Sequence, residues 1–196
     1  MNNILEKLNK DQLKLFKRVD VKKEKVLFNE GELCSLIGFV VEGEIEIVSY
    51  TRTGQEIVYN HLTPGMMFGN NLVFSSNPVY KGNVIAVQPS IILLIEKGDL
   101  MQILQQNSDF LLEFLKYQSD MGKQLNSQIK LISIDSAEER FFYYADINKG
   151  TIHYSSITKL AEILHLQRET LSRLISRLIK ENRIIKVNKT IKIVNE

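Results

Sequence analysis

The spacing of apolar residues changes once along the 196-residue chain, and this change constrains the fold more than any other feature. From Lys25 to about Glu96, apolar and polar residues alternate in short runs separated by Gly, Asn and Pro, which is typical of β-strands. From Asp99 onward, apolar residues recur every three or four positions, the period of an α-helix. We therefore predict an α+β protein with an antiparallel β-roll, or jelly roll, followed by helices.

Two turns delimit a hairpin in the β-rich half. The segment 39–48 alternates apolar residues with glutamates and contains a turn at Glu42-Gly43-Glu44. A second turn at Arg52-Thr53-Gly54 leads into a further strand over residues 56–62. Because no helical crossover separates these strands, we do not expect the parallel sheet of a nucleotide-binding enzyme.

Cysteine and histidine are too few for most metal chemistry. Cys34 is the only cysteine and there are three histidines, so one chain cannot supply a structural zinc site or a four-thiolate iron–sulfur cluster. A cupin-like metal enzyme needs grouped histidines and carboxylates, yet His61 has no other histidine within ten residues. No P-loop, His-Glu-x-x-His or Gly-x-Ser-x-Gly motif is present. We expect no metal site and no enzyme, and we assign no certain cofactor.

Nothing in the sequence directs the chain to a membrane. The longest strongly apolar stretch, residues 89–95, is about a third of the ~20 residues that cross a bilayer. The start of the chain mixes charged and apolar residues and lacks a signal-peptide pattern. We therefore expect a cytoplasmic protein that does not bind membranes.

Residues 108–134 contain no proline and predict one long helix. Its stripe at spacings of three and four consists of Leu111, Phe114, Gln118, Met121, Leu125, Gln128 and Ile132. Such a stripe is typical of a coiled coil with two polar positions. We predict a homodimer whose seam contains Leu111, Phe114, Gln118, Met121, Leu125 and Ile132. The alternative is one amphipathic helix that packs on its own domain.

The carboxyl-terminal segment is basic and compact. Residues 151–196 hold nine Lys/Arg against four Asp/Glu, a net charge of +5 within a chain whose total is +2. A basic module on a mildly acidic body favours a nucleic-acid binder, and the alternative is a solvated surface helix. We predict three parts, which are a β-roll sensor over 1–107, a dimerisation helix over 108–134 and a winged helix-turn-helix over 135–196.

Capping residues and turns divide this last part into helices. Asp135 or Ser136 caps the first helix, and Ser156 caps a second helix that ends near Leu164. His165 follows in a tight turn, where histidine is one of the few non-glycine residues that tolerate a positive φ. A third helix covers about 168–181, and a β-ribbon follows with its turn at Asn188-Lys189.

The third helix has two distinct faces at about 100° per residue. We predict that its core face consists of Leu171, Leu174, Ile175, Leu178 and Ile179. The opposite face carries Arg168, Glu169, Ser172, Arg173 and Ser176, while Arg177 and Lys180 flank it. Arginine can grip guanine and glutamate can accept from cytosine in a major groove, and the flanking cations can reach phosphates. The pattern predicts contact with double-stranded DNA.

The segment 156–178 resembles the Crp/Fnr family of bacterial transcription regulators, whose recognition helix carries a similar Arg-Glu-Thr-x-x-Arg run. Arg168, Glu169, Thr170 and Arg173 match that run. The resemblance implies that Arg168, Glu169 and Arg173 read base edges in a palindrome with half-sites close to TGTGA. The chain departs from the family at two positions, with Gln167 in place of Ser and His165 in place of Gly.

The amino-terminal half resembles the cyclic-nucleotide-binding β-roll of the same family, through segments 27–31, 39–44 and 62–69 in order. The long helix falls where the family has its dimer helix. The resemblance implies a homodimeric regulator, with RNA polymerase as a further candidate partner. The alternative is a cyclic-nucleotide-binding-like regulatory protein that acts through protein contacts without binding DNA.

The resemblance also places an effector pocket, and its residues depart from the family pattern. The predicted pocket consists of Phe68, Gly69, Asn70, Asn71, Tyr80, Lys81 and Gly82. Members that bind cyclic AMP carry a Glu after Phe-Gly and an Arg about ten residues later. Asn70 and Tyr80-Lys81 stand there instead, and lysine lacks the two-pronged fork of arginine. We expect no cyclic AMP binding, and a cavity that is empty, filled by Tyr80, or shaped for an unknown small-molecule effector.

Overall fold

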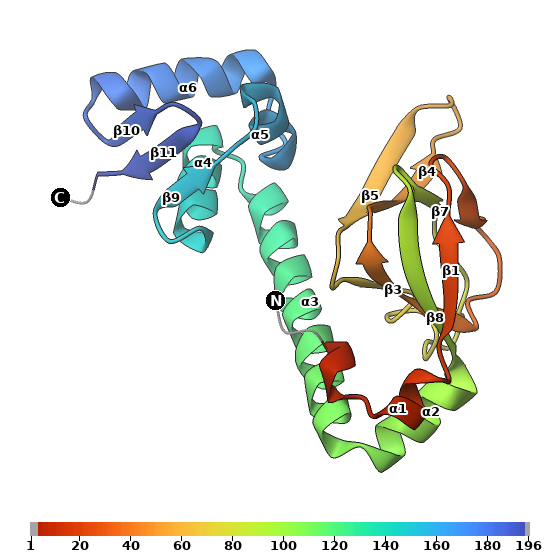
Figure 1. Cartoon of the computed structure of the whole chain (residues 1–196). Coiled ribbons are helices and arrows are strands. Elements are labelled where there is room, and N and C mark those ends of the chain that lie inside the picture. The colour runs from red at the N-terminus through yellow and green to blue at the C-terminus, as the bar shows by residue number, and fades with distance from the viewer. Residues whose placement is uncertain (1–3, 195–196) are drawn as a thin grey trace. The chain divides into compact units, whose positions relative to one another are not determined.

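The structure is a computed structural model that describes residues 4–194, and the chain divides into two compact units, Met1–Ser119 and Asp120–Glu196 (Figure 1). The boundary between the units falls inside α3 (Ser108–Ser133), the segment for which one long helix is predicted. The predicted limits of the three parts, 1–107, 108–134 and 135–196, stay predictions.

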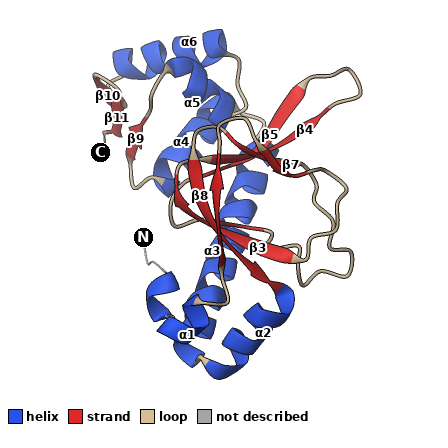
Figure 2. Cartoon of the chain, turned by 45° about the vertical axis from the view of Figure 1, so that its right-hand side comes forward, coloured by secondary structure: helices blue, strands red, loops and turns tan. Residues whose placement is uncertain are grey.

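Two four-stranded antiparallel sheets form the body of the first unit (Figure 2). One sheet has the order β1 (Lys17–Val21), β8 (Ser90–Glu96), β3 (Leu36–Glu42), β6 (Met67–Phe68). The other has the order β2 (Val26–Phe28), β7 (Asn83–Ala86), β4 (Ile45–Tyr50), β5 (Glu56–Leu62). The antiparallel jelly roll predicted from the strand pattern is confirmed.

The two predicted turns lie where the chain reverses. Gly43 has a φ of +85°, and a Cβ there would lie 2.5 Å from the carbonyl oxygen of Pro89. Glycine is therefore required between β3 and β4. The turn at 52–54 joins β4 to β5, and β5 begins and ends at the predicted residues, 56 and 62.

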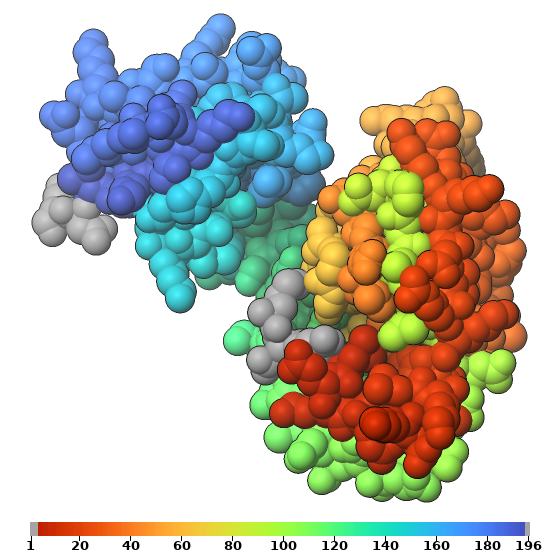
Figure 3. Space-filling model, viewed as in Figure 1, coloured from red at the N-terminus to blue at the C-terminus, as the bar shows by residue number. Residues whose placement is uncertain are grey.

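Short helices pack against the sheet that contains β1. They are η1 (Ile4–Lys7), α1 (Lys10–Leu13) and α2 (Lys97–Gln106). Figure 3 shows the red amino-terminal segment lying against the green segment of α2 and α3. Asn107 fixes this junction, because its side-chain amide donates to the carbonyl of Lys7 and its oxygen accepts from the backbone N–H of Phe110.

The second unit is a three-helix cluster with a small sheet. Its elements after α3 are α4 (Ala137–Ile147), β9 (Thr151–His153), α5 (Ile157–Ile163), α6 (Arg168–Lys180), β10 (Ile184–Val187) and β11 (Thr190–Ile193). Ser136 and Ser156 cap α4 and α5 through their side-chain oxygens. The predicted β-ribbon is β10 and β11, and β9 adds a third strand that the sequence pattern did not reveal.

Arg140 of α4 holds the second unit together at a point where helix ends meet. Its guanidinium donates to the carbonyls of Ile134, at the end of α3, and of Leu164 and His165, at the end of α5. Carbonyl groups at helix ends lack partners within the helix, and a cation there also opposes the negative end of the helix dipole. One side chain therefore satisfies backbone groups from two helix ends.

We expect Gly38→Ala to destabilise the first unit. A Cβ at Gly38 of β3 would lie 2.0 Å from the buried ring of Phe68, so the ring must move, and such overpacking costs about 1–3 kcal/mol. Gly98→Ala in α2 is the matched control, because a Cβ there meets nothing within 4 Å. Urea unfolding of both variants measures the difference, and equal stabilities would contradict the packing described for Phe68.

We expect Arg140→Met to lower the local stability of the turn between α5 and α6 by about 1.5–3 kcal/mol, the range for hydrogen bonds to charged groups. Hydrogen exchange of the amides in α5 measures this free energy of opening. Arg140→Lys keeps the charge but has no planar fork, so we expect an intermediate loss. Lys159→Met, which removes an exposed cation of α5, should change it by less than about 0.5 kcal/mol. Unchanged exchange in Arg140→Met would show that the three carbonyls do not need the arginine.

Candidate nucleic-acid interface

A tight turn joins α5 to α6. His165 has a φ of +51°, as predicted from its position. Its backbone N–H donates to the carbonyl of Glu162, and the N–H of Leu166 donates to the carbonyl of Ala161. Gln167 then adopts an extended conformation at the start of α6, without a side-chain capping bond. The turn therefore closes through backbone bonds, and this fixes the direction in which α6 leaves.

The apolar face of α6 anchors the helix on the core of the second unit. Leu171, Leu174, Ile175 and Leu178 are buried, as predicted. Ile179 was predicted to face the core, and this prediction is wrong because its side chain is 40% exposed. At 100° per residue Ile179 lies about 20° from Arg168, on the side of the polar residues.

The opposite face of α6 is polar and open to solvent. Its exposed residues are Arg168, Glu169, Ser172, Arg173 and Ser176. The Ser176 hydroxyl donates to the carbonyl of Ser172, so the middle of the face is low and carries no bulky group. Over the described residues 4–194, Arg168, Arg173 and Lys180 form no ion pair. Three cations along this helix are therefore available to a polyanion.

Arg177 differs from these three cations. Its guanidinium pairs with Glu138 of α4, and Glu138 also pairs with Arg183. The hydrogen bond that Arg183 donates to Glu138 raises the pKa of Arg183, and the guanidinium of Arg183 lies 4.6 Å from the centre of the Phe142 ring. Sequence reasoning missed Glu138 and Arg183, because they lie 39 and 45 residues apart from their partners.

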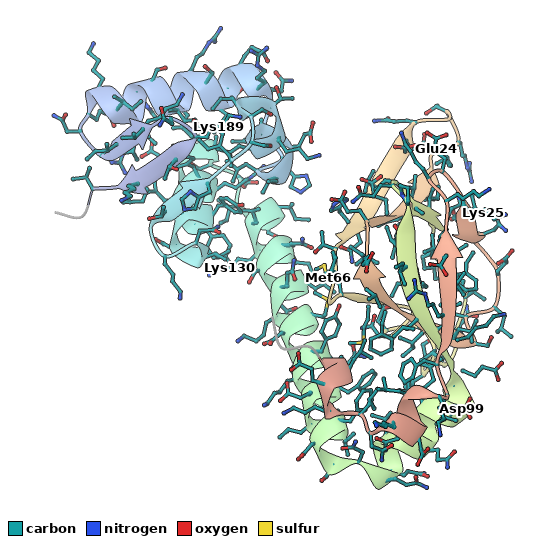
Figure 4. All side chains as sticks on the ribbon, in the orientation of Figure 1. Glu24, Lys25, Met66, Asp99, Lys130 and Lys189 are labelled. Carbon is teal, nitrogen blue, oxygen red and sulfur yellow. The ribbon has the colours of Figure 1, made fainter. Side chains whose placement is uncertain are left out.

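The β10–β11 hairpin adds basic residues beside the helix–turn–helix. Its turn contains Asn188, with a φ of +52°, as the Asn188-Lys189 turn prediction requires. Lys186, Lys189 and Lys192 are exposed on this hairpin, in β10, in its turn and in β11. Figure 4 shows the side chains of the second unit, with Lys189 labelled. The hairpin has the form of a wing.

The residues of the predicted effector pocket lie in and around the loop between β6 and β7. The ring of Tyr80 is 3% exposed and stacks on Phe28, with ring centres 4.9 Å apart. Phe28 also contacts Phe68 at 6.1 Å. Burial, and then the neighbouring Cys34 thiol, raise the pKa of Tyr80, and its hydroxyl has no hydrogen-bond partner of good geometry. Aromatic side chains therefore occupy the interior of the roll beside this loop.

Asn70 connects the loop to α3. Its amide donates to the side-chain oxygen of Gln118, and the Gln118 amide donates to the backbone carbonyl of Asn70 at 3.0 Å. One residue before Gln118, the Tyr117 hydroxyl accepts from the N–H of Met67 at 3.0 Å. Asn70 was predicted for the effector pocket and Gln118 for the dimer seam, and the structure brings the two together.

The remaining residues of the predicted effector pocket are exposed side chains and glycines. Asn71 and Lys81 are exposed. Gly69 has a φ of +77°, and a Cβ there would lie 2.6 Å from the carbonyl oxygen of Leu36. A Cβ at Gly82 would lie 2.9 Å from the carbonyl oxygen of Val48. Both glycines allow close approach of one backbone segment to another.

The exposed apolar residues of α3 coincide only in part with the predicted seam, since Leu125 and Ile132 are exposed but Phe114 is not. Phe114 is 5% exposed and belongs to the core of the first unit. Five large apolar residues of α3 have about half of their surface exposed: Leu112, Leu115, Leu125, Ile129 and Ile132. Leu115 and Ile129 thus lie one helical row away from Phe114 and Met121. The spacing of apolar residues along α3 does not separate the face that packs on its own unit from the face that stays exposed. Only the packing of the helix shows which apolar residues are covered.

Two classes of site are not found in the described chain. No group of three or more His, Cys, Asp or Glu residues in the 4–194 range could hold a metal ion. None of the helices described is both long and apolar enough to cross a membrane.

Comparisons with known proteins agree with this architecture. Residues 18–107 match the family model of the cyclic nucleotide-binding domain. The anaerobic regulatory protein of Bacillus subtilis (strain 168) is 22% identical over 185 residues, which cover 89% of this chain and 77% of that protein.

Solved structures extend the similarity over nearly the whole chain. The catabolite activator protein of Thermus thermophilus is 19% identical, with a TM-score of 0.58, and the match covers 98% of this chain and 94% of that one. A mutant of CooA from Carboxydothermus hydrogenoformans is 18% identical, with a TM-score of 0.69, over 99% of this chain and 91% of that one. Residues 18–107 thus match the cyclic nucleotide-binding domain, and the whole chain shares the fold of these regulators, in agreement with the predicted resemblance to the Crp/Fnr family.

Proposed function

We propose that this protein is a homodimeric, sequence-specific DNA-binding transcription regulator that places α6 in the major groove of a palindromic site. The observation that carries the proposal is the polar face of α6. Its cations are exposed and unpaired within the described chain, while the apolar face of the same helix is fully used in packing. A rigid helix with a free basic face fits the width of the major groove.

Each residue of the face has a chemical role in this proposal. Arg168 and Arg173 grip guanine edges in a bidentate manner, and Glu169 accepts from the cytosine amino group. Ser172 and Ser176 keep the helix surface low, so the backbone can approach the bases. Lys180 and the wing lysines contact phosphates, which position the protein without reading sequence. Arg177 contacts a phosphate of the DNA backbone after its ion pair with Glu138 has opened.

Dimerisation follows from the apolar surface of α3. The row at alternating spacings of four and three consists of Leu111, Leu115, Gln118, Gly122, Leu125, Ile129 and Ile132, of which Leu111 and Gln118 are half-buried and the others exposed. This heptad spacing is that of a two-stranded coiled coil. A two-fold axis through the paired helices relates two copies of α6, and a symmetric protein binds a symmetric site.

Cyclic AMP is not the effector in this proposal. Tyr80 and Phe28 fill the interior of the roll beside the β6–β7 loop, and the side-chain amide of Asn70 donates a hydrogen bond to Gln118. No arginine stands where the family's phosphate ligand would be, since Tyr80 is buried and Lys81 points to the exposed surface. A protein that acts only through protein contacts would not need the free cations of α6, so that alternative is not favoured. RNA polymerase stays a candidate partner of the bound dimer.

Selection of bound sequences from random duplex DNA tests the proposal. The purified full-length protein, without added ligand, should enrich one palindrome. Enrichment without ligand would also show that no effector is obligatory. If no sequence is enriched with or without extracts of small metabolites, and binding to random DNA is weak, DNA recognition is refuted.

We expect Arg173→Ala to weaken binding to the selected palindrome by about 1–3 kcal/mol and to relax one symmetric base pair in each half-site. Arg52→Ala, which removes one exposed cation from the turn before β5, is the control for net charge. Fluorescence anisotropy on specific and random duplexes measures both. Equal losses on the two duplexes would show that Arg173 contacts phosphate only.

We expect Leu125→Glu with Ile129→Glu to yield folded monomers that lose palindrome binding. Two unpaired carboxylates in an apolar seam are costly to bury. Lys123→Glu changes the net charge by the same two units at an exposed position outside the row and should leave the dimer intact. Sedimentation velocity gives the masses, and circular dichroism checks that each variant is folded. An intact dimer in the first variant would place the interface elsewhere.

A further inference from the structure

The β-roll contains a cavity that lies outside the predicted effector pocket, and we refer to it as the second cavity. Its volume is about 520 Å³, within the range of small-ligand sites. Most of its lining is apolar and comes from four strands: Val19, Val21, Val26, Leu27, Phe28, Leu36 and Leu94. Val21 is buried, Val26 is exposed at the mouth, and the others are half-buried. The polar lining residues are Asp20, Lys22 and Lys25.

The cavity exists because the roll is open along one edge. β1 is the end strand of one sheet and β2 is the end strand of the other, so these two strands do not pair with each other. The turn between them, residues 22–25, holds their ends close together. Glu24 has a φ of +63° there, and its N–H donates to the carbonyl of Ala86. The opening between the sheets is therefore a fixed feature of the topology.

Charge at the mouth of the cavity is positive. Two lysines and one carboxylate, Lys22, Lys25 and Asp20, line it; both lysines are exposed, and neither forms an ion pair within residues 4–194. The acidic neighbours are already paired. Glu24 lies 3.6 Å from the ammonium of Lys23, and Asp20 bonds to Arg18, which lowers the pKa of Asp20. Figure 4 labels Glu24 and Lys25 at this turn.

We propose that this cavity binds a small amphipathic carboxylate, a molecule with an aliphatic body and one anionic head group. The body replaces water on the apolar lining, and the head group lies between Lys22 and Lys25, where charge-assisted hydrogen bonds form. Each additional methylene that enters the cavity tightens binding by up to about fourfold. A neutral molecule of the same length buries the same aliphatic body but cannot form the charge-assisted hydrogen bonds with the lysines.

Phe28 links this site to the rest of the roll. Its side chain lines the cavity and also stacks on Tyr80 and contacts Phe68. Asn70, two residues after Phe68, holds Gln118 of α3. A ligand that displaces Phe28 therefore acts on the loop that contacts α3. This regulatory consequence rests on the proposed DNA-binding function, whereas the binding site itself stands on the geometry of the β-roll.

Calorimetric titration of the full-length protein tests the site without any use of DNA. The probes are hexanoate, octanoate and decanoate below their micellar concentrations, with 1-octanol and cyclic AMP as comparison compounds. We expect one decanoate per chain, affinity that rises from hexanoate to decanoate, and octanoate about tenfold tighter than 1-octanol. No saturable decanoate binding at millimolar concentration, or equal affinity for octanoate and 1-octanol, would refute the proposal.

Matched variants locate the ligand. Lys22→Gln with Lys25→Gln should weaken decanoate binding about tenfold, while Lys17→Gln with Lys23→Gln, which removes two cations that do not line the cavity, should leave it unchanged. Val26→Trp at the mouth, where the side chain is 36% exposed, should block entry without entering the core. Binding that survives both Val26→Trp and the Lys22 and Lys25 substitutions would place the ligand elsewhere. A failure to bind DNA affects none of these measurements.

Discussion

The interior of the β-roll depends on the contact between the Phe68 ring and the backbone of Gly38. The ring lies where any side chain at position 38 would be, so β3 and β6 approach closely and Phe68 is fully buried. Phe28 packs on Phe68 and Tyr80 stacks on Phe28. This chain of rings fills the space beside the β6–β7 loop. Close packing at one glycine thus fixes the position of the rings in this part of the interior.

The second unit depends in a similar way on helix ends. Arg140 satisfies carbonyls at the end of α3 and the end of α5, and the buried leucines of α6 fix that helix on the same core. Because the Arg140 hydrogen bonds and the buried leucines lie on the inner side of α6, the residues on its outer side are not needed for packing. Arg168 and Arg173 on this side are positioned by the helix backbone and form no ion pair in the described chain. A surface that is rigid in position and unpaired in charge suits recognition of a polyanion.

The helix α3 belongs to both units and carries two apolar faces. Phe110 and Phe114 fill the core of the first unit, and Leu131 enters the core of the second. The remaining exposed row is the surface that the proposed dimer uses. Tyr117 and Gln118 bond to the loop at Met67 and Asn70. Gln118 also belongs to the row of the proposed dimer, so the loop and the proposed seam share one residue.

Features that depend on neighbouring residues could be predicted from the amino-acid sequence. The change in apolar period predicts strands followed by helices, Ser156 and His165 predict the limits of α5 and its turn, and the spacing of Leu171 and Arg173 predicts the two faces of α6. The tertiary structure alone decided the rest. Phe114 is buried while Leu115 is exposed, Ile179 faces solvent, Tyr80 lies inside the roll, and Glu138 holds Arg177. These outcomes depend on groups that lie tens of residues apart, and periodicity records which residues share a face but not what covers that face.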